Sequence, residues 1–208
     1  MQNLSGGRKM ERNHCKMIFC ERTQISSMLL AIVCLTLVSP GFTQDTMDPM
    51  AATVDKWFTM IQKSFIDLAD AMPAEKFDFK PKDGAFANVR TFGEQVKHVA
   101  CANFAFFNEI EGKTPPDKCW EGGPSAANSK SELMEYLRES FAYAQQVLQK
   151  MTPGNALDKM SGPYGGESTR LGITTLAIWH VSDHYGQLVV YLRMNGIVPP
   201  ASRPRQAQ

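Results

Sequence analysis

Two histidines four residues apart, His180 and His184, are the part of this sequence best suited to chemistry. On an α-helix this spacing places both imidazoles on one face, one turn apart, where they can hold the same ligand. Only two other histidines occur in the 208 residues, His14 near the N-terminus and His98 in the middle of the chain. Neutral imidazole is a common ligand of zinc and other divalent ions. We expect His98, His180 and His184 to hold one metal ion.

The residues around the histidine pair exclude two known kinds of metal site. A zincin-type protease needs a glutamate directly after the first histidine as its general base, and this chain has Val181 there. A carboxylate-bridged di-iron site needs Glu-x-x-His motifs on its helices, and none occurs after residue 41. A three-histidine site with its fourth position open to water or substrate remains. The expected ion is zinc by default, with nickel or iron as the alternatives.

The same pattern has a second interpretation, which the residues alone leave open. A His-x-x-x-His pair often arises by chance, and a lone histidine such as His98 on a buried helix is more often a core residue than a metal ligand. Burying two unpartnered imidazoles in the apolar stripe of a helix would, however, cost on the order of a few kcal/mol. A shared metal removes that cost because both rings then have a partner.

Helices with regularly spaced core residues are predicted to position these histidines. Apolar residues recur every three or four positions, and capping residues, prolines or glycines mark the helix ends. The predicted helices run from Asp48-Pro49 to Pro73, from Thr91 to about Ile110, from Ser129 or Ser131 to about Leu148, and from about Thr169 to Asn195. Trp57 is expected in the core, and the segment 73–90 is long enough for a crossover connection. The pattern predicts an all-α bundle.

The N-terminal segment has the charge and hydropathy pattern of a secretory signal. Its first 24 residues carry five Lys/Arg and two acidic residues, and a 14-residue apolar run from Ile25 to Val38 follows. That run is shorter than the roughly 20 residues of a membrane-spanning helix. We expect cleavage after Gly41, with Gln44 as the alternative, and so an exported protein of the periplasm or the extracellular space. An uncleaved N-terminal anchor is the competing interpretation.

Removing residues 1–41 changes both the charge and the cysteine count. The remaining chain has 17 basic and 19 acidic residues and no basic patch, so we expect no nucleic-acid partner. It keeps two of the five cysteines, Cys101 and Cys119. In an oxidising compartment these two are expected to form a disulfide. The alternatives are that Cys101 is a fourth metal ligand or a free thiol in the core.

Two parts of the sequence resemble the DinB-like (DinB/YfiT) family. The segment His180 to Pro200, HVSDHYGQLVVYLRMNGIVPP, is similar to the last helix of that family. The segments Lys76 to Pro81 (KFDFKP) and Val89 to Ala100 (VRTFGEQVKHVA) also resemble it. The resemblance covers about residues 47–200 and implies a four-helix bundle with a crossover connection.

The resemblance also implies that one histidine of the second helix and two of the fourth hold a metal, and these fall on His98, His180 and His184. Members include S-transferases and isomerases that use low-molecular-weight thiols, metal-dependent hydrolases, and proteins with no assigned activity. The signal sequence argues against a thiol cofactor, since reduced thiols are scarce outside the cytoplasm. We expect a metal-dependent hydrolase or transferase. A non-catalytic metal- or ligand-binding module and a thiol-dependent S-transferase are the alternatives.

The remaining expectations concern the surroundings of the site and the domain limits. The residues expected around the metal are Glu94, Asn103, Asp183, Tyr185 and Gln187. The predicted domains are a signal peptide at 1–41, the bundle at 47–200 and a flexible tail at 201–208. The predicted partner is a small-molecule substrate or ligand, with no stable membrane span after processing. A homodimer is compatible with the sequence.

Overall fold

The structure, a computed structural model, describes residues 48–125 and 127–204, so the predicted signal peptide lies outside the described residues. Its long helices are α2 (Pro49–Ala71), α3 (Phe92–Ile110), α4 (Lys130–Leu148) and α5 (Arg170–Met194). Its short elements are the 3-10 helices η1 (Ala74–Lys76), η2 (Cys119–Glu121) and η3 (Pro200–Ser202) and the strands β1 (Lys159–Ser161) and β2 (Glu167–Thr169). The expected all-α class is confirmed. Within this part of the chain, no helix combines the length and the apolar character needed to cross a membrane.

Each long helix begins at a residue whose side chain accepts hydrogen bonds from free backbone N–H groups. These caps are Asp48 before α2, Thr91 before α3, Ser129 before α4 and Thr169 before α5. At Thr91 and Ser129, a glutamate three residues further on completes a capping box. Gly196, with φ +73°, follows the end of α5. The predicted helix starts are confirmed. They could be predicted because each cap joins residues only two or three positions apart in the sequence.

The core lies between the four long helices, where α2 and α3 each pack against both α4 and α5. Phe58 is fully buried and meets Phe107 and Phe141 edge-on, with ring centroids 5.5 Å and 5.7 Å apart. The prediction that Trp57 belongs to this core is wrong, since its side chain is 55% exposed. Successive helical residues are rotated by about 100°, and on α2 it is the next residue, Phe58, that points inward.

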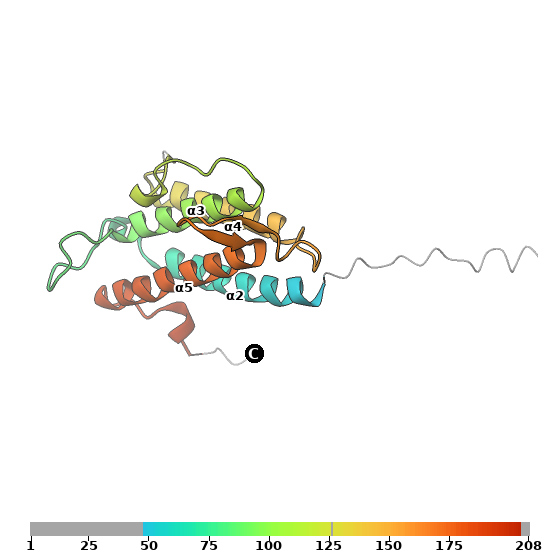
Figure 1. Cartoon of the computed structure of the whole chain (residues 1–208). Coiled ribbons are helices and arrows are strands. Elements are labelled where there is room, and N and C mark those ends of the chain that lie inside the picture. The colour runs from blue at the N-terminus through green and yellow to red at the C-terminus, as the bar shows by residue number, and fades with distance from the viewer. Residues whose placement is uncertain (1–47, 126, 205–208) are drawn as a thin grey trace, which may run out of the picture. The chain divides into compact units, whose positions relative to one another are not determined.

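Figure 1 shows α2 and α5 running in one direction and α3 and α4 in the other. Tyr191, near the end of α5, donates to the Arg90 carbonyl just before α3 at 3.1 Å, which makes these two helices antiparallel. Lys150 and Glu111, which follow α4 and α3, form an ion pair at 2.6 Å. Neighbouring α3 and α4 are therefore parallel, and the connection 111–129 must return along the length of the bundle.

The lengthwise crossover thus lies at 111–129 and not at 73–90, although the segment 73–90 is long enough for one. The segment 73–90 joins α2 to α3 at one end of the bundle, where Gly93 N donates to the Phe77 carbonyl at 2.7 Å. The two connections have similar lengths, so length alone could not distinguish them. For the site, the consequence is that the crossover brings η2 against α3.

A short hairpin precedes α5 and a 3-10 helix follows it. β1 and β2 pair antiparallel, and the turn between them is closed by Gly162 N donating to the Gly166 carbonyl at 2.9 Å. In the last turn of α5, Arg193 donates to Ser202 Oγ at 3.0 Å, and beyond the helix residues 200–202 form η3. Residues 205–208 of the predicted tail lie outside the described residues.

Candidate metal centre

The three histidines grouped by the sequence analysis meet between α3 and α5. His98 lies on α3, and His180 and His184 lie one turn apart on α5. All three are buried, with ring centroids 5.1 Å (His98–His180), 5.0 Å (His98–His184) and 4.6 Å (His180–His184) apart. One ring nitrogen of each lies within 4.8 Å of the others, so the group could hold a metal ion.

Hydrogen bonds orient two of the three rings. His98 Nδ1 lies 2.6 Å from the Cys119 carbonyl oxygen, which can only accept, so Nδ1 carries the proton. His184 Nδ1 donates in the same way to Gln95 Oε1 at 2.8 Å. In each neutral ring, Nε2 then keeps its lone pair for another ligand. Such an outer hydrogen bond is the usual support of a metal-binding histidine.

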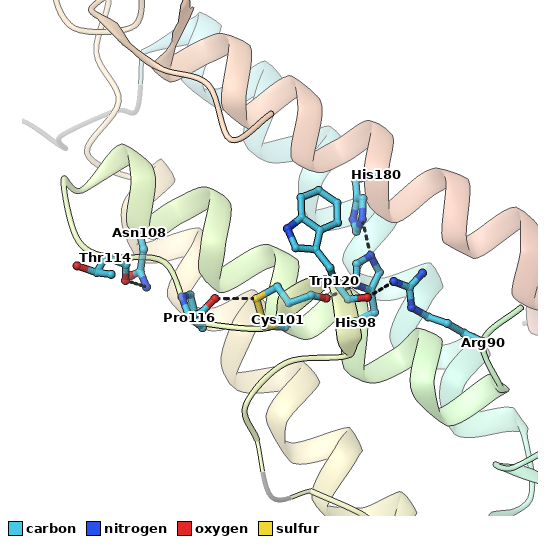
Figure 2. Close-up of a disulfide and its surroundings, with 9 residues drawn as sticks. Arg90, His98, Cys101, Asn108, Thr114, Pro116, Trp120 and His180 are labelled. Carbon is cyan, nitrogen blue, oxygen red and sulfur yellow. Dashed lines mark hydrogen bonds between the residues drawn. A yellow bond between two sulfur atoms is a disulfide. The ribbon is translucent and has the colours of Figure 1, made fainter. Parts of the chain in front are cut away.

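Packing, rather than a hydrogen bond at Nδ1, positions His180. Its Nδ1 is buried and has no hydrogen-bond partner in the described part of the chain. Its ring stands edge-on to Phe106, with centroids 5.4 Å apart, and its Nε2 lies 3.2 Å from His98 Nε2 (Figure 2). The donor set that fits a metal ion is therefore three imidazoles, two of them with their outer nitrogen already bonded.

Burial lowers the pKa of all three histidines. It lowers the pKa of His180 to about 3 and that of His184 to about 4, and the charges that the neighbouring histidines would carry add to the effect. Burial also lowers the pKa of His98, although the hydrogen bond to the Cys119 carbonyl acts in the opposite direction. At neutral pH the rings are therefore uncharged, which is the form that binds a metal ion.

None of the five side chains expected around the metal is a hydrogen-bond partner of the three histidines. Glu94 caps α3, Asn103 donates to a side chain of α4, Gln187 donates to Asp183 on the exposed side of α5, and Tyr185 packs at the edge of the core. Only the charge of Asp183 reaches the site, where it opposes the lowering of the His184 pKa. None of the five residues therefore supports a histidine ring through a hydrogen bond.

The groups that do support the rings are Gln95 and the backbone of Cys119. Gln95 is 2% exposed and lies three residues before His98, so both side chains project from one face of α3. That spacing is visible in the sequence and could have singled out Gln95. The Cys119 carbonyl carries no comparable signal, because every residue has a carbonyl.

The expected disulfide between Cys101 and Cys119 is present, with the two Cα atoms 5.3 Å apart. It ties the crossover to α3 about one turn beyond His98, as Figure 2 shows. In the same loop, the Trp120 carbonyl accepts a hydrogen bond from the Arg90 guanidinium. Because its sulfur is bonded to Cys119, Cys101 is neither a fourth metal ligand nor a free thiol.

An open pocket of about 450 Å³ lies over His98 and His180. The crossover and the hairpin turn form two of its walls, and α3 forms a third. Its aromatic residues are Phe106, Trp120 and Tyr164, and the last two are more than half exposed with ring centroids 5.3 Å apart. The charged residues of the lining are Glu109, Asp117 and Lys118. The pocket gives a small and partly apolar molecule access to His98 and His180.

Comparison with known proteins identifies the class to which this bundle belongs. The chain is a member of the DinB superfamily, whose model matches residues 58–188, a stretch that contains all three histidines. Among solved structures, the crystal structure of a DinB-like protein from Bacillus subtilis, yjoa, superposes with a TM-score of 0.55 and 20% sequence identity, over 74% of this chain and 99% of that chain. This likeness shows the fold alone. No curated protein matches the chain.

Proposed function

We propose that the protein is an exported, metal-dependent enzyme of the DinB superfamily that hydrolyses a small molecule. One divalent ion, zinc by default, would be held by His98, His180 and His184. The observation that carries the proposal is that three buried imidazoles lie together and that two of them, His98 and His180, line an open pocket. An ion in that position would act as a Lewis acid and lower the pKa of a bound water or thiol, so that a nucleophile forms near neutral pH.

The donor set supports this choice of ion and of chemistry. The Cys119 carbonyl and the Gln95 side chain keep the Nε2 atoms of His98 and His184 unprotonated. Neutral ligands leave the full positive charge on the ion, which favours an anionic fourth ligand. Imidazole also suits nickel and iron, so the identity of the metal is a matter for direct analysis.

The pocket indicates the substrate class. Phe106, Trp120 and Tyr164 offer ring faces and edges that can cover a flat apolar group. The charged residues of the lining have opposite signs, so they do not favour a strongly charged substrate. We infer that the substrate is a small ester or amide with an aryl or similar flat group next to the scissile bond.

The disulfide supports hydrolysis over thiol-dependent S-transfer. The bond between Cys101 and Cys119 is of a kind that persists in oxidising compartments. This agrees with the predicted signal sequence and with export. Low-molecular-weight thiols are mostly oxidised in such compartments, whereas water is always available.

Two measurements on the mature protein, purified without an affinity tag, test the proposal. Metal analysis should find one divalent ion per chain. A screen of aryl esters, amides and electrophilic thiol acceptors should find turnover that needs no added thiol and is lost in His180→Ala and His184→Ala. Gln187→Ala is the matched control, because Gln187 lies on the same helix and donates to Asp183 on its exposed side.

Each failure has its own meaning. Turnover that requires a thiol would replace hydrolysis with S-transfer. A full complement of metal without any turnover would favour a binding module. Unchanged metal content in a variant with alanine at His98, His180 and His184 would contradict the site itself.

A further inference from the structure

Cys119 is connected to α3 in two chemically different ways. Its sulfur is bonded to Cys101, and its carbonyl oxygen accepts a hydrogen bond from His98 Nδ1 at 2.6 Å. His98 and Cys101 are three residues apart on α3, so their side chains project from one face of the helix, about one turn apart. The disulfide and the hydrogen bond therefore join the same two short segments.

The local backbone sets the direction of this carbonyl but not its distance from α3. Lys118 has a left-handed conformation, with φ +62°, and Gly123 N donates to the Lys118 carbonyl at 2.8 Å, which closes a tight turn around Cys119. These interactions lie within the loop. The disulfide and the hydrogen bond from Arg90 to the Trp120 carbonyl connect this turn to other parts of the bundle. Of these two, only the disulfide is covalent.

We propose that the Cys101–Cys119 disulfide is a redox-sensitive positioning element of the metal site, which holds the Cys119 carbonyl against His98 and weakens metal binding when it is reduced. This inference rests on the metal binding proposed above. Reduction by a dithiol breaks the S–S bond in two thiol–disulfide exchanges. The dithiol gives up two electrons and two protons and closes to its own disulfide, while both cysteines become thiols.

The effect on the metal follows from the role of the outer hydrogen bond. Once the covalent tether is broken, the Cys119 carbonyl can move away from His98. The ring then loses the acceptor that fixes its tautomer and its orientation. Loss of such a partner typically lowers metal affinity about 10- to 100-fold. The same loop contributes Pro116 and Trp120 to the pocket, so reduction also loosens one pocket wall.

The test measures the zinc affinity of the mature protein by competition with a chromophoric chelator. Three forms are compared: the oxidised protein, the protein after treatment with a dithiol that is then removed, and the variant Cys101→Ala/Cys119→Ala. We expect both disulfide-free forms to bind zinc about 10- to 100-fold more weakly than the oxidised protein. The same dithiol treatment should leave the double variant unchanged, which shows that the reductant acts through this bond.

A second readout does not depend on zinc. In the oxidised, zinc-free protein the His98 Nδ1–H should give an NMR signal that is protected from exchange with water. This signal should be lost in the two disulfide-free forms, because the carbonyl acceptor is no longer held in place. A role limited to overall stability would leave the signal intact in folded protein.

Two glycines provide a matched pair of variants should the double variant fail to fold. A Cβ atom at Gly123 would lie 2.6 Å from Cys101 Cβ and Sγ, whereas one at Gly122 would meet Lys97 Cδ at 3.8 Å. Both glycines have positive φ, +88° and +98°, so alanine strains the backbone similarly at each. Gly123→Ala should weaken zinc binding more than Gly122→Ala, since it alone displaces the disulfide.

The possible outcomes separate this inference from the proposed function. Equal zinc affinity in oxidised and disulfide-free protein, both folded, would overturn the inference and leave the metal site standing. Tighter binding by the dithiol-treated protein alone would also overturn it, because the freed thiolates would then be ligands. If the oxidised protein binds no zinc, the proposed metal site is contradicted. The NMR signal of His98 Nδ1–H then still tests whether the disulfide positions the ring.

Discussion

His184 Nδ1 donates a hydrogen bond to Gln95 Oε1 at 2.8 Å, across the interface between α5 and α3. Both side chains are buried, so water competes little for this bond. The acceptor keeps Nε2 of His184 unprotonated, as the Cys119 carbonyl does for His98. The antiparallel pair α3 and α5 therefore supplies the three histidines and also a side chain that orients one of them.

Replacing Gln95 with methionine removes this acceptor while keeping a side chain of similar length. We expect the zinc affinity of Gln95→Met to fall about 10- to 100-fold, since His184 loses the bond that fixes its orientation. Gln95→Glu keeps an acceptor at the same place and should bind zinc more tightly than Gln95→Met. Calorimetric titration of the mature protein measures both, with Gln187→Met as the control on the exposed side of α5. Unchanged affinity in folded Gln95→Met would show that this bond does not support the ligand.

The metal-free protein should lose stability on acidification over a range set by the buried histidines. In the unfolded chain a histidine titrates near 6.5, whereas in the folded protein burial lowers the pKa of His180 to about 3 and that of His184 to about 4. Between these values the unfolded state binds more protons than the folded state. The free energy of unfolding is therefore highest above about pH 6.5 and falls below it, on the order of 1 kcal/mol per pH unit for each histidine.

Urea denaturation of metal-free protein at steps from about pH 7 to pH 4 measures this slope. The variant His180→Gln/His184→Gln should have a shallower dependence, because glutamine does not titrate. Carboxylates contribute to both proteins alike and cancel in the comparison. If the two slopes were equal, the buried histidines would not control the acid stability of the fold.

The three histidines could be grouped from the sequence because two separate observations, their spacing and their small number, select the same residues. The spacing of His180 and His184 places them on one helical face, and His98 is the other histidine of the predicted mature chain. The helix starts at Thr91 and Ser129 could also be predicted, since a capping box depends on residues only three positions apart.

The rest depends on contacts between distant segments, which local patterns do not encode. The crossover at 111–129 is defined by the parallel arrangement of α3 and α4, and the other long connection has a similar length. Trp57 has the spacing of a core residue, yet the rotation of α2 against its neighbours places Phe58 inside. The Cys119 carbonyl belongs to the backbone, so its position against His98 follows from the turn and the disulfide rather than from a residue type.

Export, which is still a prediction, can be checked at the N-terminus of the mature protein. Mass spectrometry of protein from the periplasm or the medium should find a chain that begins after Gly41, or after Gln44 as the alternative. Gly41→Phe should shift or block cleavage after this position, because signal peptidase requires small residues there. A full-length chain in the membrane fraction of cells that carry the unchanged sequence would instead favour an uncleaved anchor.

The aromatic pair Trp120 and Tyr164 predicts a preference for ligands that carry a flat group. Benzohydroxamate and acetohydroxamate share a metal-binding group and differ in having a phenyl or a methyl substituent. We expect benzohydroxamate to bind the zinc-loaded protein on the order of tenfold more tightly, because its ring removes apolar surface from water against these side chains. Calorimetry measures both affinities.

In Trp120→Ala the difference in affinity between the two hydroxamates should shrink, while the affinity for acetohydroxamate stays the same. Trp179→Ala is the control, since Trp179 is equally exposed on α5 but does not line the pocket. Equal binding of the two probes to the parent protein would contradict the substrate class, and failure of both to bind a zinc-loaded protein would mean that the metal has no open position.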